Sequence, residues 1–350
     1  MNPKTSALPN IEDVAAAAGV STATVSRVLN QPSSVRETLR KRVTDAIAQL
    51  GYVPHAGARA LKLQRSGTIG AIFPTIDNAI FAKSIHALQA RLALDGLQLL
   101  IATSGYNIEA ETQQAVNLVT RGADGLVLVG TGQSPLLLQF LRQRSLPVVH
   151  TMSFPAPAGM DCVGFDNARA MAQAVRYLID LGHRHIAMLA GIVHDNDRAA
   201  ERVRGVQEAL AKAGLDLPAH YLVERPYGLA DAREGFRALM AAKPRPTAVL
   251  CGNDVLAVGA ILEAKALGLE VPRAVSIIGF DDLEIARHVQ PALTTLHVPT
   301  QQMWETVAER LVAKLEGAPL APAMEVEVGL VVRESTGPAP ITARRKSGGK

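Results

Sequence analysis

IEDVAAAAGVSTATVSRVLN, residues 11–30, decides how the start of this chain folds. A small residue at Ala15, a glycine four positions later at Gly19 and a valine at Val25 have the spacing of a helix-turn-helix. Ala15 leaves room for the second helix to cross the first, and Gly19 supplies the positive φ that ends the first helix. Ser21 is a good N-cap for the second helix. The stretch therefore predicts two short packed helices.

The solvent face of the second helix carries no apolar stripe that a protein core would bury. Its residues are Thr22, Ala23, Ser26, Arg27 and Asn30. A polar helix face of this size fits the major groove of DNA, where side chains reach the base edges. The alternative is that the helix pair is a surface feature of some other domain.

The segments that follow favour the DNA interpretation. Residues 37–50 have the apolar periodicity of a third helix, and basic side chains gather near its start: Arg36, Arg40, Lys41 and Arg42. Residues 55–66 form a short alanine-rich helical segment. A helix of that length is not stable alone in water, so it needs a partner helix, DNA or both.

From residue 10 to about residue 336 the chain resembles the lactose-repressor (LacI/GalR) family of transcription regulators. The motifs that carry the resemblance are DVAxxAGVSxxTVSRVLN at 13–30 and LGYVPHxxARAL at 50–61. The resemblance implies that residues 55–66 are a hinge helix, which pairs with its copy in a homodimer and wedges Leu61 into the minor groove of a palindromic operator. His55 stands where the family usually has Asn, so that phosphate contact is not carried over. The expected DNA-binding residues are Thr22, Ala23, Ser26, Arg27, Asn30, Tyr52, Ala58 and Leu61.

Charge divides the chain into parts. Residues 1–66 hold nine Lys and Arg against four Asp and Glu, a net +5, whereas residues 67–336 carry a net −5 and residues 337–350 a net +4. A basic head on an acidic body is typical of a DNA-binding head joined to a module that does not bind DNA. We expect a head at 1–54, a hinge at 55–66, a body at 67–336 and a disordered basic tail from 337.

Other classes of protein are disfavoured by what the sequence lacks. It has no apolar run long enough to span a membrane, and MNPKTSALPN at 1–10 has no signal-peptide core, so we expect a cytoplasmic protein. Cys162 and Cys251 are distant from each other, which fits a reducing compartment, and His183 and His185 are a weak metal motif. We expect no metal and no cofactor. The absence of GxSxG, P-loop, HExxH and GxGxxG motifs argues against an enzyme.

Beyond residue 66, short apolar runs alternate with helical stretches, which predicts parallel sheets built from right-handed crossovers. The expected fold is an all-α helix-turn-helix head plus an α/β body of two doubly wound parallel-sheet lobes, and the family resemblance implies that this body is periplasmic-binding-protein-like. Lobe 1 is expected at 67–163 and 298–325, and lobe 2 at 164–297 and 326–336. The expected strands are 69–73, 98–102, 125–129, 148–150, 162–165, 186–189, 221–223, 248–251, 276–279 and 293–297.

Ligands of such sheets bind at the carboxyl ends of the strands. Asn253 and Asp281 follow two predicted strands, and the resemblance implies that they and Arg202 bind the effector. A carboxylate, a guanidinium and an amide together suit the vicinal hydroxyls of a sugar. The alternative for Asp281 and Asp282 is that they cap the next helix. Phe81 follows the first strand and either stacks on a sugar face or belongs to the core.

These features predict a repressor whose operator affinity is controlled by a small effector bound between the lobes. LIATSGY at 100–106, CVGFDN at 162–167 and GHRHIA at 182–187 are similar to the gluconate-operon repressor branch, which implies a sugar acid such as gluconate. Arg202 and Asp281 are closer to the neutral-sugar pattern. Two alternatives remain: a sugar-binding protein without a regulatory role, and a regulator that responds to a purine. The sequence does not say whether the ligand releases DNA or tightens its binding.

Overall fold

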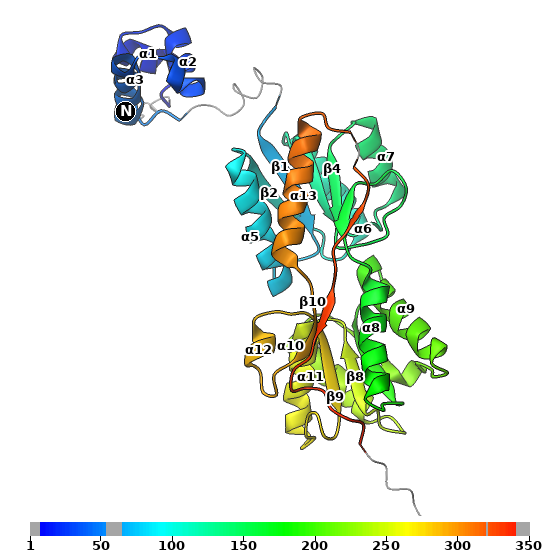
Figure 1. The fold of residues 1–350 in the computed structure, drawn as a ribbon. Helices are drawn as coiled ribbons and strands as arrows, with labels where there is room; N and C mark the ends of the chain where they lie inside the picture. Colours follow the sequence, from blue (N-terminus) through cyan, green and yellow to red (C-terminus); the bar gives the residue numbers. More distant parts are fainter. Residues whose placement is uncertain (1–7, 54–64, 320, 341–350) are drawn as a thin grey trace, which may run out of the picture. The chain divides into compact units, whose positions relative to one another are not determined.

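The computed structural model describes residues 8–53, 65–319 and 321–340. The chain divides into two compact units between Ser66 and Gly67, a small head and a large body (Figure 1). Among the described residues, no helix has both the length and the apolar character needed to cross a membrane.

The head is a small helical unit. Asn10 caps its first helix with a capping box, and Gly19 ends that helix at φ +59°, as the sequence predicts. Ser21 caps the second helix by accepting the Thr24 N–H. Valines from all three α-helices form the core of the unit. Its elements are α1 (Ile11–Ala18), α2 (Thr22–Asn30), the 3-10 helix η1 (Pro32–Ser34) and α3 (Glu37–Leu50).

Two head residues have roles that the sequence did not predict. Tyr52 was expected to contact DNA, but its side chain is only 8% exposed and packs in the core of the head, because the turn after α3 folds back on the helices. Arg42 was expected in the basic cluster, yet its Nη2 donates to Ala18 O at 2.5 Å. Arg42 therefore satisfies a carbonyl at the carboxyl end of α1 and joins α3 to it.

Lobe 1 of the body is a six-stranded parallel sheet with helices on both faces (Figure 1). In spatial order its strands are β11 (Met324–Glu325), β5 (Cys162–Gly164), β4 (Val148–Thr151), β3 (Gly125–Val129), β1 (Thr68–Phe73) and β2 (Gln98–Thr103). Its helices are α5 (Ala79–Leu94), α6 (Ile108–Thr120), α7 (Pro135–Gln143) and α13 (Thr300–Leu315). The central strands β1 and β3 are almost wholly buried, as parallel strands covered on both faces must be.

Lobe 2 repeats this arrangement with a second six-stranded sheet, in which only β12 is antiparallel to its neighbour. Its strands in spatial order are β12 (Gly329–Val331), β10 (Thr294–His297), β9 (Ser276–Asp281), β8 (Ala248–Cys251), β6 (Ile186–Gly191) and β7 (Leu222–Arg225). Its helices are α8 (Asn167–Asp180), α9 (Asp197–Lys212), the 3-10 helix η2 (Ala219–Tyr221), α10 (Leu229–Met240), α11 (Asp254–Ala266) and α12 (Ile285–His288).

The expected fold class is confirmed, and a strand lies at each of the ten expected positions. The chain crosses between the two sheets three times, after β5, after β10 and after β11. These three crossing segments connect the two lobes of the body (Figure 1).

The segment after residue 336 was expected to be a disordered tail from its first residue, and this is wrong for residues 337–340. The Gly337 N–H donates to Ser276 Oγ at 3.1 Å, and the Ala339 N–H donates to Leu181 O at 2.8 Å. Buried His183 also contacts Gly337 O, through Nε2 at 3.0 Å. These bonds attach residues 337–340 to lobe 2. The remaining tail, 341–350, lies outside the described residues.

Candidate functional site

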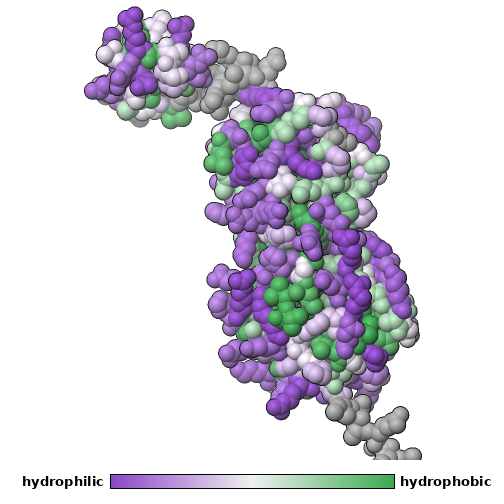
Figure 2. Space-filling model, viewed as in Figure 1, coloured by the Kyte–Doolittle hydropathy of each residue, from purple (hydrophilic) through white to green (hydrophobic). Residues whose placement is uncertain are grey.

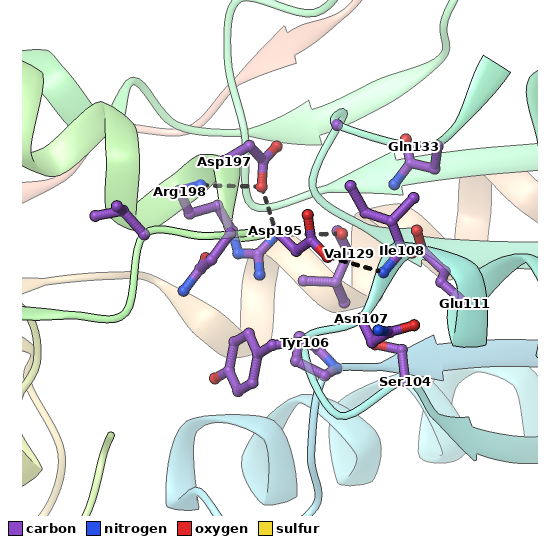
Figure 3. A pocket seen from close by; sticks show the side chains of 14 residues that line it. Ser104, Tyr106, Asn107, Ile108, Glu111, Val129, Gln133, Asp195, Asp197 and Arg198 are labelled. Atoms are coloured by element: carbon purple, nitrogen blue, oxygen red, sulfur yellow. Dashed lines mark hydrogen bonds and ion pairs between the residues drawn. The ribbon is translucent and has the colours of Figure 1, made fainter. Parts of the chain in front are cut away.

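Three adjoining cavities of about 240, 950 and 30 Å³ lie between the lobes, where the carboxyl ends of both sheets face each other. Tyr106 from lobe 1 and Asn196 from lobe 2 line all three, so the cavities form one cleft. Figure 3 shows the cavity of about 240 Å³, with side chains from both lobes converging on it. Facing sheet ends of this kind are a common location for ligand sites.

The smallest cavity brings together the four residues that the sequence predicted for effector binding. Phe81, Arg202, Asn253 and Asp281 all line it, although they come from four different elements. Its volume of about 30 Å³ is that of one water molecule, so a ligand held there must also extend into the larger cavities. We refer to it as the inner cavity.

Asp281 is the last residue of β9 and is only 5% exposed. Its backbone has φ +108°, a strained value for a residue with a Cβ. Burial raises the pKa of its carboxyl to about 7, and Arg202 lowers it in part. Within the described part of the chain, no hydrogen-bond donor faces this carboxylate. An aspartate held in this way is available to accept a hydrogen bond from a ligand.

The alternative that Asp281 and Asp282 cap the next helix is not what the structure shows. Helix α12 has Glu284 at its N-cap position and no side-chain cap. Asp282 instead bonds Arg333 at 2.6 Å and His297 at 3.0 Å, which ties β9 to the last segment of the body. Neighbouring carboxylates therefore have different roles, one structural and one facing the cleft.

Arg202 lies on α9 and is held in place from three sides. Its Nε donates to Asn167 Oδ1 at 2.9 Å, its Nη1 donates to Gly252 O at 2.5 Å, and its guanidinium lies 3.8 Å from the centroid of the Phe280 ring. A planar guanidinium stacked on a ring and bonded at two donors has one orientation. Arg202 therefore presents a fixed edge to the inner cavity.

Asn253 caps α11 with its Oδ1, which accepts the Leu256 N–H at 2.9 Å. Its side chain is 2% exposed, and its Nδ2 has no hydrogen-bond partner among the described residues. Leaving a buried donor unpaired costs roughly 1–3 kcal/mol. Because Asn253 lines the inner cavity, a ligand oxygen placed there satisfies this donor.

Phe81 belongs to the core, which is one of the two roles that its sequence position allowed. It is 4% exposed and packs edge-on against Phe73, with ring centroids 5.8 Å apart. Phe73 in turn stacks on Trp304, the one tryptophan of the chain, at 5.2 Å. Phe81 is therefore a core residue that also forms a wall of the inner cavity.

Several cleft residues were missed by sequence reasoning. Tyr106 from lobe 1 and Tyr227 from lobe 2 face each other with ring centroids 6.0 Å apart, and both line the inner cavity and the largest cavity. Tyr106 follows β2 at its carboxyl end and has φ +59°. Its place after a strand was the one available signal, whereas its pairing with Tyr227 depends on how the lobes meet.

Asp197 and Arg198 at the start of α9 bond lobe 2 to lobe 1 (Figure 3). Asp197 Oδ2 accepts the Thr131 N–H at 2.7 Å and the Ser153 hydroxyl at 3.2 Å. Arg198 Nη1 donates to Asp197 Oδ1 at 2.7 Å and to Val129 O at 3.2 Å. Burial alone would raise the pKa of Asp197, but Arg198 and these donors hold it below its usual value. We call these bonds the Asp197 contact.

The candidate DNA-binding face lies on α2. Thr22, Ala23, Arg27 and Asn30 are exposed, and Ser26 is half-buried. Asn30 Nδ2 donates to Ser26 O at 2.7 Å, so this side chain lies along its own helix. Ala58 and Leu61 of the expected hinge lie outside the described residues.

No group of three His, Cys, Asp or Glu side chains within the described ranges is placed to hold a metal ion.

Comparison with known families agrees with this division of the chain. Residues 10–55 match the model for bacterial regulatory proteins of the lacI family, and residues 175–336 match the model for a periplasmic binding protein-like domain.

Two curated relatives match along most of their lengths. The HTH-type transcriptional regulator GntR of Escherichia coli (strain K12) is 33% identical over 316 residues, which are 90% of this chain and 95% of that protein. The HTH-type transcriptional repressor PurR of Salmonella paratyphi A (strain ATCC 9150 / SARB42) is 33% identical over 345 residues, which are 97% of this chain and 100% of that protein.

Solved structures give the same picture. The lac repressor dimer bound to operator and the anti-inducer ONPF is 26% identical, with a TM-score of 0.83 over 95% of this chain and 100% of that one. A transcriptional regulator CelR–cellobiose complex is 30% identical, with a TM-score of 0.68 over 93% of this chain and 99% of that one.

Proposed function

The chain belongs to the LacI family of bacterial regulatory proteins, and from this premise we propose that it is a repressor controlled by a small hydroxylated effector in the cleft between its lobes. As a member of this family it is a DNA-binding transcriptional regulator and not an enzyme. We place its action in the cytoplasm, where bacterial operators lie.

The observation that carries the effector proposal is the inner cavity. Arg202, Asn253 and Asp281 converge on it with a fixed guanidinium edge, an unpaired amide donor and a buried carboxylate. Donors and acceptors side by side suit vicinal hydroxyls, each of which both donates and accepts. The cellobiose complex of the related CelR supports a saccharide as the class of ligand.

The DNA proposal rests on the head. Its exposed α2 face and net charge of +5 over residues 1–66 fit major-groove readout supported by phosphate contacts. We propose that Leu61 from the hinge wedges into the minor groove and that Ala58 contacts DNA beside it. The small exposed part of Tyr52 limits any contact of that side chain with DNA.

We propose that the chain acts as a homodimer, as a palindromic operator requires. Strand β2 is the edge of its sheet and leaves Leu100 and Ile101 39% and 43% exposed, and Leu94 at the end of α5 is 80% exposed. Figure 2 shows further apolar side chains gathered on one face of lobe 2. Uncovered apolar edges of this kind are suited to pairing with a second copy.

The test uses the full chain and DNA fragments selected for binding from a random pool. Anisotropy titrations with a panel of sugars, sugar acids and purines measure whether any ligand changes operator affinity. We expect one saccharide to change it at least tenfold and Asp281→Asn to abolish that change while leaving operator affinity intact. A ligand that binds without changing operator affinity would indicate a binding protein without a regulatory role, and a response to purines alone would replace the saccharide proposal.

A further inference from the structure

The cleft carries an excess of negative charge. Six carboxylates line its three cavities: Asp77, Glu111, Asp195, Asp197, Asp231 and Asp281. The two guanidinium groups that line it belong to Arg198 and Arg202.

Both arginines are already bonded to the protein. Arg198 pairs with Asp197 and donates to Val129 O, and Arg202 donates to Asn167 and to the Gly252 carbonyl. Each arginine is also matched by a carboxylate of the cleft, because Arg198 pairs with Asp197 and Arg202 is the charged neighbour of Asp281 in the inner cavity. Neither arginine is therefore left over as a counter-ion for an anionic ligand.

Two further carboxylates, by contrast, have no charged partner. In the described chain, Asp77 and Asp231 form no ion pair. Asp77 and Asp231 line the cavity of about 950 Å³ from opposite lobes, so their fields add within it. Protein walls of low dielectric focus such a field and make it stronger than on an open surface.

The acidic side chains alone would not make a site, but Asn253 provides an independent indication of a ligand. Its Nδ2 is buried, unpartnered and part of the inner cavity wall, so it requires an acceptor atom. A hydroxyl oxygen satisfies this donor without bringing a charge. An anionic oxygen satisfies it too, but has to be desolvated in a cleft where carboxylates outnumber guanidinium groups, which is costly.

We propose that the cleft selects a polyhydroxylated ligand without negative charge, accepts an added amino group, and rejects sugar acids and sugar phosphates. This inference rests on the proposed function, because it assumes that the cleft is the effector site. Of the two ligand classes that the sequence allows, the charge of the cleft favours a neutral sugar. The similarity of residues 100–106, 162–167 and 182–187 to the gluconate-operon repressor branch favours the other class, a sugar acid such as gluconate.

The potential in the cleft is measurable without knowing the effector. Ile76 lines the largest cavity and is 56% exposed, while the native Cys162 and Cys251 are both buried. In the full chain, Ile76→Cys therefore adds one reactive thiol at the cleft. This thiol is reacted with two charged methanethiosulfonates of similar size, the cationic trimethylammonium-ethyl reagent and the anionic sulfonatoethyl reagent. The ratio of the two reaction rates reports the electrostatic potential at the thiol, and the rate with neutral methyl methanethiosulfonate reports how accessible the thiol is.

The matched control is Leu136→Cys, which places a thiol at a 72% exposed position on α7 of the same lobe. We expect the ratio of cation to anion rates to be at least tenfold higher at the cleft thiol than at the control thiol. Adding Asp77→Asn and Asp231→Asn should bring the ratio down toward the control. If Ile76→Cys does not fold, Ile192→Cys, 42% exposed and lining the same cavity, replaces it.

Equal ratios at the two positions, or a higher anion rate in the cleft, would overturn the inference. A second measurement compares glucose, glucosamine and gluconate as ligands of the full chain, and gluconate binding that is lost in Asp281→Asn would also overturn it. If none of the three sugars binds, that result counts against the proposed function, and the thiol ratio still decides the charge selection.

Discussion

The carboxylate of Asp197 in lobe 2 accepts the backbone N–H of Thr131 in lobe 1 at 2.7 Å, and this bond holds the two sides of the cleft together. The Ser153 hydroxyl donates to the same oxygen from lobe 1. Gly130 permits this approach, since it has φ +87° and a Cβ there would collide with Arg198 and Asp197. The two lobes are therefore bonded directly to each other at the cleft.

The first prediction concerns this Asp197 contact. Asp197→Asn removes the charge that strengthens the bonds to Thr131 and Ser153, and bonds to a charged group are worth about 1.5–3 kcal/mol. We expect the cleft to open more often, so the Thr131 amide should exchange its hydrogen about tenfold faster or more. Hydrogen-exchange mass spectrometry of the full chain measures this.

The matched control is Asp195→Asn, two residues earlier, whose carboxylate accepts the Ile108 N–H at the longer distance of 3.4 Å. It should leave exchange at Thr131 unchanged. Unchanged exchange in Asp197→Asn as well would show that the lobes stay closed through other contacts.

The second prediction concerns effector recognition by Asp281. Asp281→Asn keeps the shape of the side chain and removes its charge, so the loss in effector affinity should be about 10- to 100-fold, as expected for a charged hydrogen bond. Trp304 packs against Phe73, which contacts Phe81 at the cavity wall, and its fluorescence can report the titration. Glu208→Gln on the exposed face of α9 is the control and should bind like the parent chain. Equal affinity in Asp281→Asn would place the effector elsewhere in the cleft.

Sequence reasoning located the strands because their apolar runs are continuous, as buried parallel strands require. It missed β11 and β12, which have only two and three half-buried residues and are too short for a strand pattern to be recognised. Arg202, Asn253 and Asp281 were found because strand ends and the family motifs place them, with no need to know how the lobes meet.

The remaining cleft residues depend on tertiary structure. Arg198 bonds across to lobe 1 and Tyr106 faces Tyr227, contacts that arise only once the two sheets face each other. Tyr52 shows a second limit of motif reasoning: the motif suggested a DNA contact, and the structure shows that most of this side chain packs in the core of the head. Motif position indicates which residues matter, but burial decides whether they matter through packing or through contact with a ligand.

The third prediction concerns base reading by Arg27 on the exposed face of α2. If Arg27 contacts a guanine with both of its terminal nitrogens, Arg27→Ala should weaken operator binding by about 1–3 kcal/mol and leave binding to random DNA nearly unchanged. Arg273→Ala, which removes an 83% exposed arginine from the body, controls for the change in charge. Equal losses on operator and random DNA would assign Arg27 to phosphate contact, and a steep fall of affinity with salt is expected in either case.

The last prediction concerns pH and the buried carboxyl of Glu111. Burial raises its pKa to about 7, while Gln133 and Arg198 lower it in part. Between its usual pKa of 4.5 and about 7, the folded state thus holds a proton that the unfolded state has lost. The free energy of unfolding must therefore fall as the pH rises through this window, by at most about 3 kcal/mol for this group.

The glutamine side chain of Glu111→Gln is uncharged at every pH, so this variant should not lose free energy of unfolding through this group. We expect the variant to match the parent chain near pH 4.5 and to be more stable than it at pH 8, as measured by urea unfolding followed through Trp304 fluorescence. Burial also raises the pKa values of Asp254 and Asp281, to about 8 and about 7. These two groups add the same pH dependence to the free energy of unfolding of the parent chain and of Glu111→Gln. Glu109→Gln, at an exposed position of the same helix, should follow the parent chain at every pH. A Glu111→Gln curve parallel to that of the parent chain would mean that Glu111 is already ionised well below pH 7 and that its burial does not make the free energy of unfolding depend on pH in this window.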